Sequence, residues 1–124
     1  MESELTKAEK EILEVLWEKK GWTSCKELVE YFHQSGKDWK RQTVNTFLTH
    51  LVEKGYAVKN GRKYIYTYTR EEFGSFKAIE LVETLYDGSL KKFLNALTGK
   101  NNPGKKYADE LREYIDEFDE DEGV

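Results

Sequence analysis

The sequence predicts a mainly α-helical fold that contains one small β-hairpin, and three observations predict it. Over most of the chain, apolar residues recur at steps of three and four, which is the period of an amphipathic helix. Between Tyr56 and Tyr68 the period changes to two, with Asn60-Gly61 in the middle. Capping and turn residues separate these segments. With 124 residues, of which 38% are hydrophobic, the chain can form one domain or two small ones.

Two helices are expected first. Thr6 and Glu9 have the spacing of a capping box, so a helix begins there, and Gly21 is expected to end it. Either Thr23 or Ser24 then caps a second helix, which a polar loop follows.

A third helix is predicted from Lys40 to Gly55, and its two sides differ in chemistry. Its apolar side carries Val44, Phe47, Leu48 and Leu51. Its other side has amides and hydroxyls with no acid among them, and these residues are Gln42, Asn45, Thr46 and Thr49. Amides and hydroxyls can match the donor and acceptor patterns of base edges in a DNA groove. From these residues alone, a solvated helix face is the alternative.

A β-hairpin is predicted directly after the third helix. Asn60-Gly61 lies between two runs of β-prone residues, and we expect it to form the centre of a type I′ turn. The tip of the hairpin is basic, with Lys59, Arg62 and Lys63.

Charge is unevenly distributed, although the whole chain has a net charge of −4. Residues 1–69 hold 12 basic and 10 acidic residues, whereas residues 70–124 hold 8 and 14. Residues 37–63 hold 7 basic residues and 2 acids. A basic middle followed by an acidic tail is typical of a nucleic-acid-binding surface joined to a part with another task.

Three helices followed by a hairpin are the order of a winged helix-turn-helix, in which the third helix enters the major groove of DNA. We therefore predict that residues 1–69 form a winged-helix domain that binds double-stranded DNA. The basic residues expected to hold phosphates are Lys40, Arg41, Lys59, Arg62 and Lys63. The residues expected to reach bases are Gln42, Asn45, Thr46 and Thr49.

Three amphipathic helices are expected in residues 70–124, the last of them beginning at Asn102-Pro103. A large apolar surface on a short acidic segment usually marks a protein contact. We therefore predict a helical dimerisation domain and a homodimer, with the alternative that these helices fold back on their own N-terminal domain. The expected interface residues are Phe76, Ile79, Val82, Leu85, Tyr86, Leu90, Phe93, Leu94, Leu97, Leu111, Ile115 and Phe118.

Enzyme chemistry has little support in the sequence. His33 and His50 fall on different predicted helices, and Cys25 has no Cys or His at the spacing of metal ligands. No Gly-rich phosphate loop is present. We predict a protein that is not an enzyme, without catalytic residues, metal or cofactor, in which Cys25 is a packing residue.

The expected location is the cytoplasm. The single cysteine cannot form a disulfide within the chain, which suits a reducing compartment. No apolar run approaches the roughly 20 residues of a membrane span. The polar, acidic N-terminus is unlike a signal peptide.

The order and spacing of several motifs resemble the penicillinase-repressor family of winged-helix transcriptional repressors. These motifs are Leu5-Thr-Lys-Ala-Glu9 with Ile12, Leu16 and Trp17; Thr43-Val44 with Leu48-Thr49; Leu51-Val-Glu-Lys-Gly55; Tyr64-Ile65-Tyr66; Leu85-Tyr86-Asp-Gly88-Ser89-Leu90; and Glu110-Leu111-Arg112 with Ile115. The resemblance covers about residues 5–118. It implies a homodimeric repressor on a palindromic operator, with C-terminal helices that interlock with a second chain.

The sequence also departs from the family pattern. Relatives commonly carry Lys and Arg where this chain has Gln42 and Asn45. This motivates an alternative function, a winged-helix protein-interaction module without specific DNA binding. In the β-lactam branch a sensor protease leads to cleavage at an Asn-Phe bond, and the matching positions here are Ala96-Leu97. The cleavage signal is therefore not reproduced, and a sensor protease stays an open partner. The Cys-x-Cys motif of the copper branch is absent.

Overall fold

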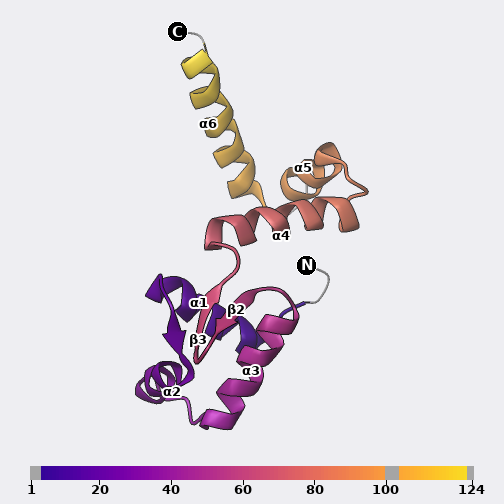
Figure 1. The fold of residues 1–124 in the computed structure, drawn as a ribbon. Coiled ribbons are helices and arrows are strands. Elements are labelled where there is room, and N and C mark those ends of the chain that lie inside the picture. Colours follow the sequence, from indigo (N-terminus) through magenta and orange to yellow (C-terminus); the bar gives the residue numbers. More distant parts are fainter. Residues whose placement is uncertain (1–3, 100–103, 123–124) are drawn as a thin grey trace. The chain divides into compact units, whose positions relative to one another are not determined.

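The computed structural model describes residues 4–99 and 104–122, and Figure 1 shows its fold. The elements within these ranges are α1 (Lys7–Lys19), β1 (Thr23–Ser24), α2 (Cys25–Gln34), α3 (Arg41–Glu53), β2 (Ala57–Asn60), β3 (Lys63–Tyr66), α4 (Arg70–Leu85), α5 (Leu90–Thr98) and α6 (Lys105–Glu122). The predicted mainly helical fold with a small β-structure is confirmed, and its first part is a winged helix-turn-helix. The predicted helix start at Asn102-Pro103 lies outside the described residues.

The chain divides into two compact units, residues 1–75 and 76–124. The boundary falls inside α4, later than the predicted boundary at residues 69 and 70. The reason is Phe73, which is 7% exposed and packs within the first unit. Its ring centroid lies 5.4 Å from that of Trp17 and 5.6 Å from that of Tyr56. The first turn of α4 therefore belongs to the N-terminal core.

Both early helices begin with the expected side-chain caps. Thr6 and Glu9 form a capping box at α1, and Ser24 forms one at α2 with Glu27. The predicted end of the first helix at Gly21 is wrong by one residue. Lys20 takes the left-handed conformation, with φ of 58°, and its N–H donates to the Leu16 carbonyl. The backbone therefore turns before the glycine is reached.

The β-structure is a three-stranded antiparallel sheet with the order β1-β3-β2, rather than a hairpin alone. β1 was not predicted as a paired strand, because a strand of only two residues is too short to show an alternation of apolar and polar residues. The predicted type I′ turn is also wrong. Asn60 pairs with Lys63, so Gly61 and Arg62 are the central residues. Only Gly61 has a positive φ, 64°, which is the pattern of a turn with glycine at its first central position.

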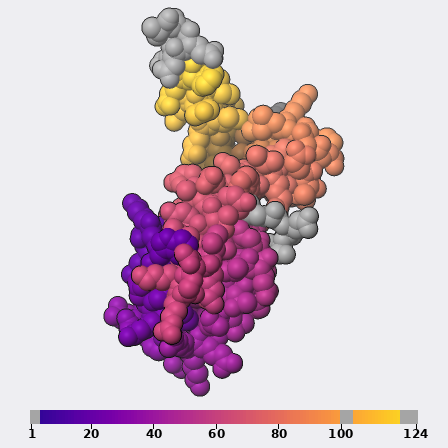
Figure 2. Space-filling view, viewed as in Figure 1, coloured from indigo at the N-terminus to yellow at the C-terminus, as the bar shows by residue number. Residues whose placement is uncertain are grey.

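The core of the first unit lies between α1, α2, α3 and the sheet. Its apolar residues with 0% exposure come from all three helices, and they are Ile12, Leu16, Leu28, Val44, Leu48 and Leu51. Trp17 packs at the edge of this core and donates its indole N–H to the Tyr68 carbonyl at 2.9 Å. Figure 2 shows the hairpin residues on the surface of this unit, between residues of α1 and α3.

Glu9 is a buried charge where the start of α1 meets the end of α3. Its side chain is 2% exposed and accepts from Lys54 Nζ at 2.6 Å and His50 Nδ1 at 3.2 Å. The same carboxylate accepts the Thr6 N–H at 3.0 Å. Burial alone would raise the pKa of Glu9. Hydrogen bonds from Lys54 and the Thr6 N–H, together with the charge of Lys54, hold that pKa below its ordinary value.

In the second unit, α5 packs against α6. Gly104 precedes α6, and a Cβ built on it would lie 2.1 Å from the Leu97 carbonyl oxygen, so only glycine fits this approach. None of the helices in the described ranges is both long and apolar enough to cross a membrane.

Replacing Glu9 tests this buried charge. Because its pKa is lowered by folding, the unfolded chain binds the proton more tightly. Glu9 therefore stabilises the fold above its unfolded pKa, and this contribution is lost as the pH falls through the folded pKa. Glu9→Gln should reduce the free energy of unfolding at neutral pH by about 1–3 kcal/mol. It should also flatten the fall in stability between about pH 5 and pH 3.

Urea unfolding followed by circular dichroism at several pH values measures both effects. Glu18→Gln is a matched control, because Glu18 is exposed on the same helix. Equal pH profiles for the wild type and Glu9→Gln would contradict the assignment.

Candidate nucleic-acid interface

The outward side of α3 has the composition that the sequence predicted. Gln42, Asn45, Thr46 and Thr49 are all exposed, while Val44, Leu48 and Leu51 on the other side are fully buried. Burial of the apolar side fixes the rotation of the helix about its axis. The amides and hydroxyls are therefore exposed on a helix that the core holds in place.

Trp39 holds the segment that leads into α3, a role that sequence reasoning did not assign. Its ring centroid lies 4.8 Å from that of Phe32 in α2 and 5.4 Å from that of Phe47 in α3. Its carbonyl oxygen lies 2.7 Å from His33 Nε2. These contacts to both helices fix the position at which α3 begins.

The start of α3 is suited to an anion. Lys40 is the N-cap residue, and its side chain makes no capping hydrogen bond. The first turn contains no acid. The unbonded N–H groups of a first turn and the helix dipole both favour a negative group there.

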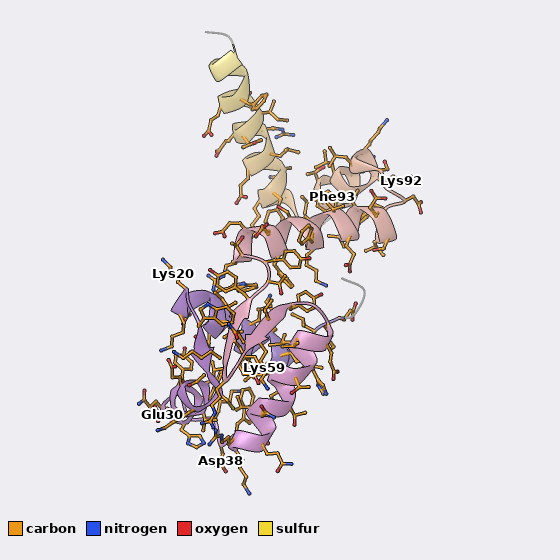
Figure 3. All side chains as sticks on the ribbon, in the orientation of Figure 1. Lys20, Glu30, Asp38, Lys59, Lys92 and Phe93 are labelled. Atoms are coloured by element: carbon orange, nitrogen blue, oxygen red, sulfur yellow. The ribbon has the colours of Figure 1, made fainter. Side chains whose placement is uncertain are left out.

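A surface hollow of about 610 Å³ lies between α2, α3 and the hairpin. Its lining residues are Ser24, Cys25, Lys26, Arg41, Asn45, Lys59, Gly61, Arg62, Lys63 and Tyr64. It unites five of the predicted DNA-contacting residues: Arg41, Asn45, Lys59, Arg62 and Lys63. Figure 3 labels Lys59, on the hairpin beside α3. The other predicted residues, Lys40, Gln42, Thr46 and Thr49, are exposed on or beside α3 but do not line the hollow.

Lys26 was missed by sequence reasoning. It lies in the first turn of α2, where a lone lysine on a predicted helix gives no signal. Only the fold brings it to the hollow. Only the expected fold could have suggested it, because the helix before the recognition helix of a helix-turn-helix crosses the DNA backbone.

The hollow is strongly positive. It has five cationic side chains and no acidic one in its lining. Lys26, Arg41, Lys59, Arg62 and Lys63 form no ion pair with any residue in the described part of the chain. Unpaired cations repel one another, so an anion entering the hollow would relieve this repulsion as well as form new contacts.

Two of the three threonines on α3, Thr46 and Thr49, use their hydroxyl protons within the helix. Thr46 donates to the Gln42 carbonyl at 3.0 Å, and Thr49 donates to the Asn45 carbonyl at 2.9 Å. Each threonine therefore presents a methyl group and acceptor lone pairs to its surroundings. Asn45 has a different partner, the Tyr64 hydroxyl, which donates to its Oδ1 at 3.4 Å.

Cys25 is buried at the floor of the hollow, as the packing role predicted from the sequence requires. Its thiol lies 3.7 Å from the Arg41 carbonyl oxygen. Burial raises the pKa of Cys25, and the nearby charge of Arg41 opposes this only in part. Among the described residues, no group of three His, Cys, Asp or Glu side chains could hold a metal ion.

The second unit exposes much of its apolar surface. Of the predicted interface residues, those most exposed are Phe76, Ile79, Leu85, Leu90, Ile115 and Phe118. The half-buried ones are Val82, Tyr86, Phe93, Leu94, Leu97 and Leu111. Leu81, Tyr107 and Tyr114 are also exposed, and the prediction did not include them.

Alkylation of Cys25 tests its environment. A raised pKa leaves less thiolate at a given pH, and burial blocks access, so native Cys25 should react with iodoacetamide more slowly than in the urea-unfolded chain. When the pH is scanned from about 7 to about 10, the alkylation rate of the native protein should increase at a higher pH than that of the unfolded chain. Mass spectrometry of timed samples measures both. Equal rates in the two states would contradict the assignment.

The sequence is similar to those of several known proteins. The methicillin resistance regulatory protein MecI of Staphylococcus aureus strain N315 is 25% identical over 116 residues, which cover 90% of this chain and 93% of that protein. MecI of Mammaliicoccus sciuri is 24% identical over 116 residues, which again cover 90% of this chain and 93% of that protein. An uncharacterized 16.5 kDa protein of Latilactobacillus sakei is 32% identical over 72 residues, or 56% of this chain and 48% of its own length.

The sequence also matches the penicillinase repressor family over residues 5–117, which spans both structural units. The match bears out the family resemblance described above. Members of this family are transcriptional repressors rather than enzymes. The chain therefore belongs to the penicillinase repressor family of transcriptional repressors.

Proposed function

We propose that the protein is a homodimeric repressor that binds double-stranded DNA at a palindromic operator. The observation that carries this proposal is the positive hollow beside α3. Five cations without ionic partners among the described residues lie next to an acid-free helix face of amides and hydroxyls. The cations suit the phosphates of DNA, and the helix face suits base edges in the major groove.

The residues divide into two roles. Lys26, Arg41, Lys59, Arg62 and Lys63, together with Lys40 at the start of α3, would hold phosphates. These contacts would fix the position of the protein on the duplex and supply much of the affinity. Gln42, Asn45, Thr46 and Thr49 would face the bases. The two threonine methyl groups suit contact with the methyl group of thymine.

The proposed dimer rests on the second unit. α5 has no buried residue, and the only buried residue of α4 is Phe73, which packs in the first unit. Exposed apolar residues such as Leu85 (66%) and Leu90 (62%) gain about 25 cal/mol per Å² when a partner covers them. A second copy of this chain is the proposed partner. A two-fold dimer would present two copies of α3 to two half-sites of an operator.

Regulation by a sensor protease is a further candidate. The Ala96-Leu97 bond lies inside α5, where Ala96 is exposed and Leu97 is half-buried. A protease would have to unwind the last turn of α5 to reach this bond.

Arg62→Ala and Asn45→Ala separate the two roles. Arg62→Ala should weaken binding to all DNA sequences alike and reduce the slope of log K against log salt by about one. Asn45→Ala should instead change base preference at one position, by about 1–3 kcal/mol. Gel-shift titrations at several salt concentrations, with an operator recovered from a random pool, measure both.

Lys19→Ala is the control, because Lys19 is exposed on α1 and does not line the hollow. If Asn45→Ala left both affinity and preference unchanged, the recognition face would be wrongly assigned. Failure of the wild type to select any sequence from the pool would favour a winged-helix module for protein contact.

Leu90→Glu tests the dimer. In sedimentation at micromolar concentration, the wild type should have twice the 14.6 kDa mass of the chain. Leu90→Glu should weaken self-association by about tenfold or more, because it places a charge in an apolar contact. Asn95→Glu adds the same charge at an exposed position of the same helix and should leave the dimer intact. A monomeric wild type would contradict the dimer.

A further inference from the structure

We propose that Tyr64 is a positioning residue that orients the side-chain amide of Asn45 and thereby sets the base that Asn45 prefers. This inference rests on the proposed DNA-binding function and deepens it. Tyr64 is not itself expected to touch DNA. It would act through Asn45, from beneath the recognition face.

Tyr64 lies where a fixed donor can be built. It is in the central strand β3, opposite Thr23 of β1 and Lys59 of β2. It is 3% exposed, so its ring has little freedom to move. Lys59 Nζ, from the neighbouring strand β2, lies over the ring at 5.7 Å from its centre. The sheet therefore holds the Tyr64 hydroxyl at a constant place beside α3.

The hydroxyl reaches Asn45, which is otherwise a solvent-exposed residue of α3. The Tyr64 hydroxyl donates to Asn45 Oδ1 over 3.4 Å. This distance is long for an O–H···O hydrogen bond, so its effect is a bias in orientation rather than a strong attachment. The neighbouring Thr49 does not compete for the Asn45 side chain. Its hydroxyl proton is already donated to the Asn45 backbone carbonyl at 2.9 Å.

The orientation has a consequence for base reading. A carboxamide is planar, so an Oδ1 turned toward Tyr64 leaves the two N–H groups of Nδ2 turned away from it. Such a group donates to acceptors in the major groove, which are O6 and N7 of guanine, N7 of adenine and O4 of thymine. The bidentate pairing of asparagine with adenine also needs Oδ1 as an acceptor. Tyr64 occupies one of the two lone pairs of that oxygen and holds it toward the sheet, which should disfavour the adenine pairing.

Tyr64→Phe removes the hydroxyl and keeps the ring. At the base position that responds to Asn45→Ala, this change should raise the preference for adenine by about threefold, the size expected for losing one weak hydrogen bond. Binding to DNA without the operator should stay the same. Tyr66→Phe is the matched control, since Tyr66 lies on the same strand and its hydroxyl makes no hydrogen bond to a described residue.

Two further measurements separate positioning from a structural role. In the Asn45→Ala background, Tyr64→Phe should have no effect on base preference, because the hydroxyl acts only through the amide. In the DNA-free protein, the side-chain amide signals of Asn45 in a nitrogen–proton correlation spectrum should move in Tyr64→Phe and stay in place in Tyr66→Phe.

The outcomes distinguish this inference from the proposed function. Unmoved Asn45 amide signals in a folded Tyr64→Phe variant would overturn the inference, whether or not the protein binds DNA. An operator-binding wild type with the same base preference as Tyr64→Phe would overturn it and leave the proposed function standing. A wild type without sequence preference would overturn both.

Discussion

The carboxylate of Glu9 is the interaction on which the placement of α3, the proposed recognition helix, depends. It completes the capping box of α1 and accepts from Lys54 and His50 at the end of α3. One buried group thus connects the start of the first helix to the end of the third. The opposite end of α3 is held by the aromatic contacts of Trp39. Between these two ends, burial of Leu48 and its neighbours fixes the rotation of the helix, so its outward face follows from contacts made elsewhere in the unit.

The proposed DNA site is a product of tertiary structure rather than of one segment. α2, α3 and the hairpin are separated along the chain, yet each contributes a cation to one hollow. Keeping these cations together without acids costs stability, because like charges repel. The fold tolerates that cost through the core beneath it. A surface on which like charges repel one another, and which a well-packed core holds together, is typical of a binding site.

Periodicity predicted the helices well, because each has an apolar side that repeats over several turns. For the same reason, Gln42 and Thr46 were correctly predicted to lie on the exposed side of α3. Features that depend on distant residues were not predictable. β1 is too short to show a period, and its strand is defined only by pairing with β3. Lys26 needs the fold to reach the hollow, and the contact of Tyr64 with Asn45 joins residues 19 positions apart. The hairpin turn was misplaced because glycine also suits the first central position of a type II′ turn, and the strand pairing places Gly61 there.

The hydroxyl bonds of Thr46 and Thr49 to their own helix have a consequence for the entropy of binding. A side chain that is free in solution loses rotamer freedom when DNA immobilises it, at a cost of about 0.5–1.5 kcal/mol for a flexible residue. Thr46 and Thr49 already occupy the rotamer that their hydrogen bonds select. A lysine or arginine in the same place would have four or more torsions to fix. The short side chains on α3 therefore offer fewer contacts than long cations would, but they are already ordered in the free protein.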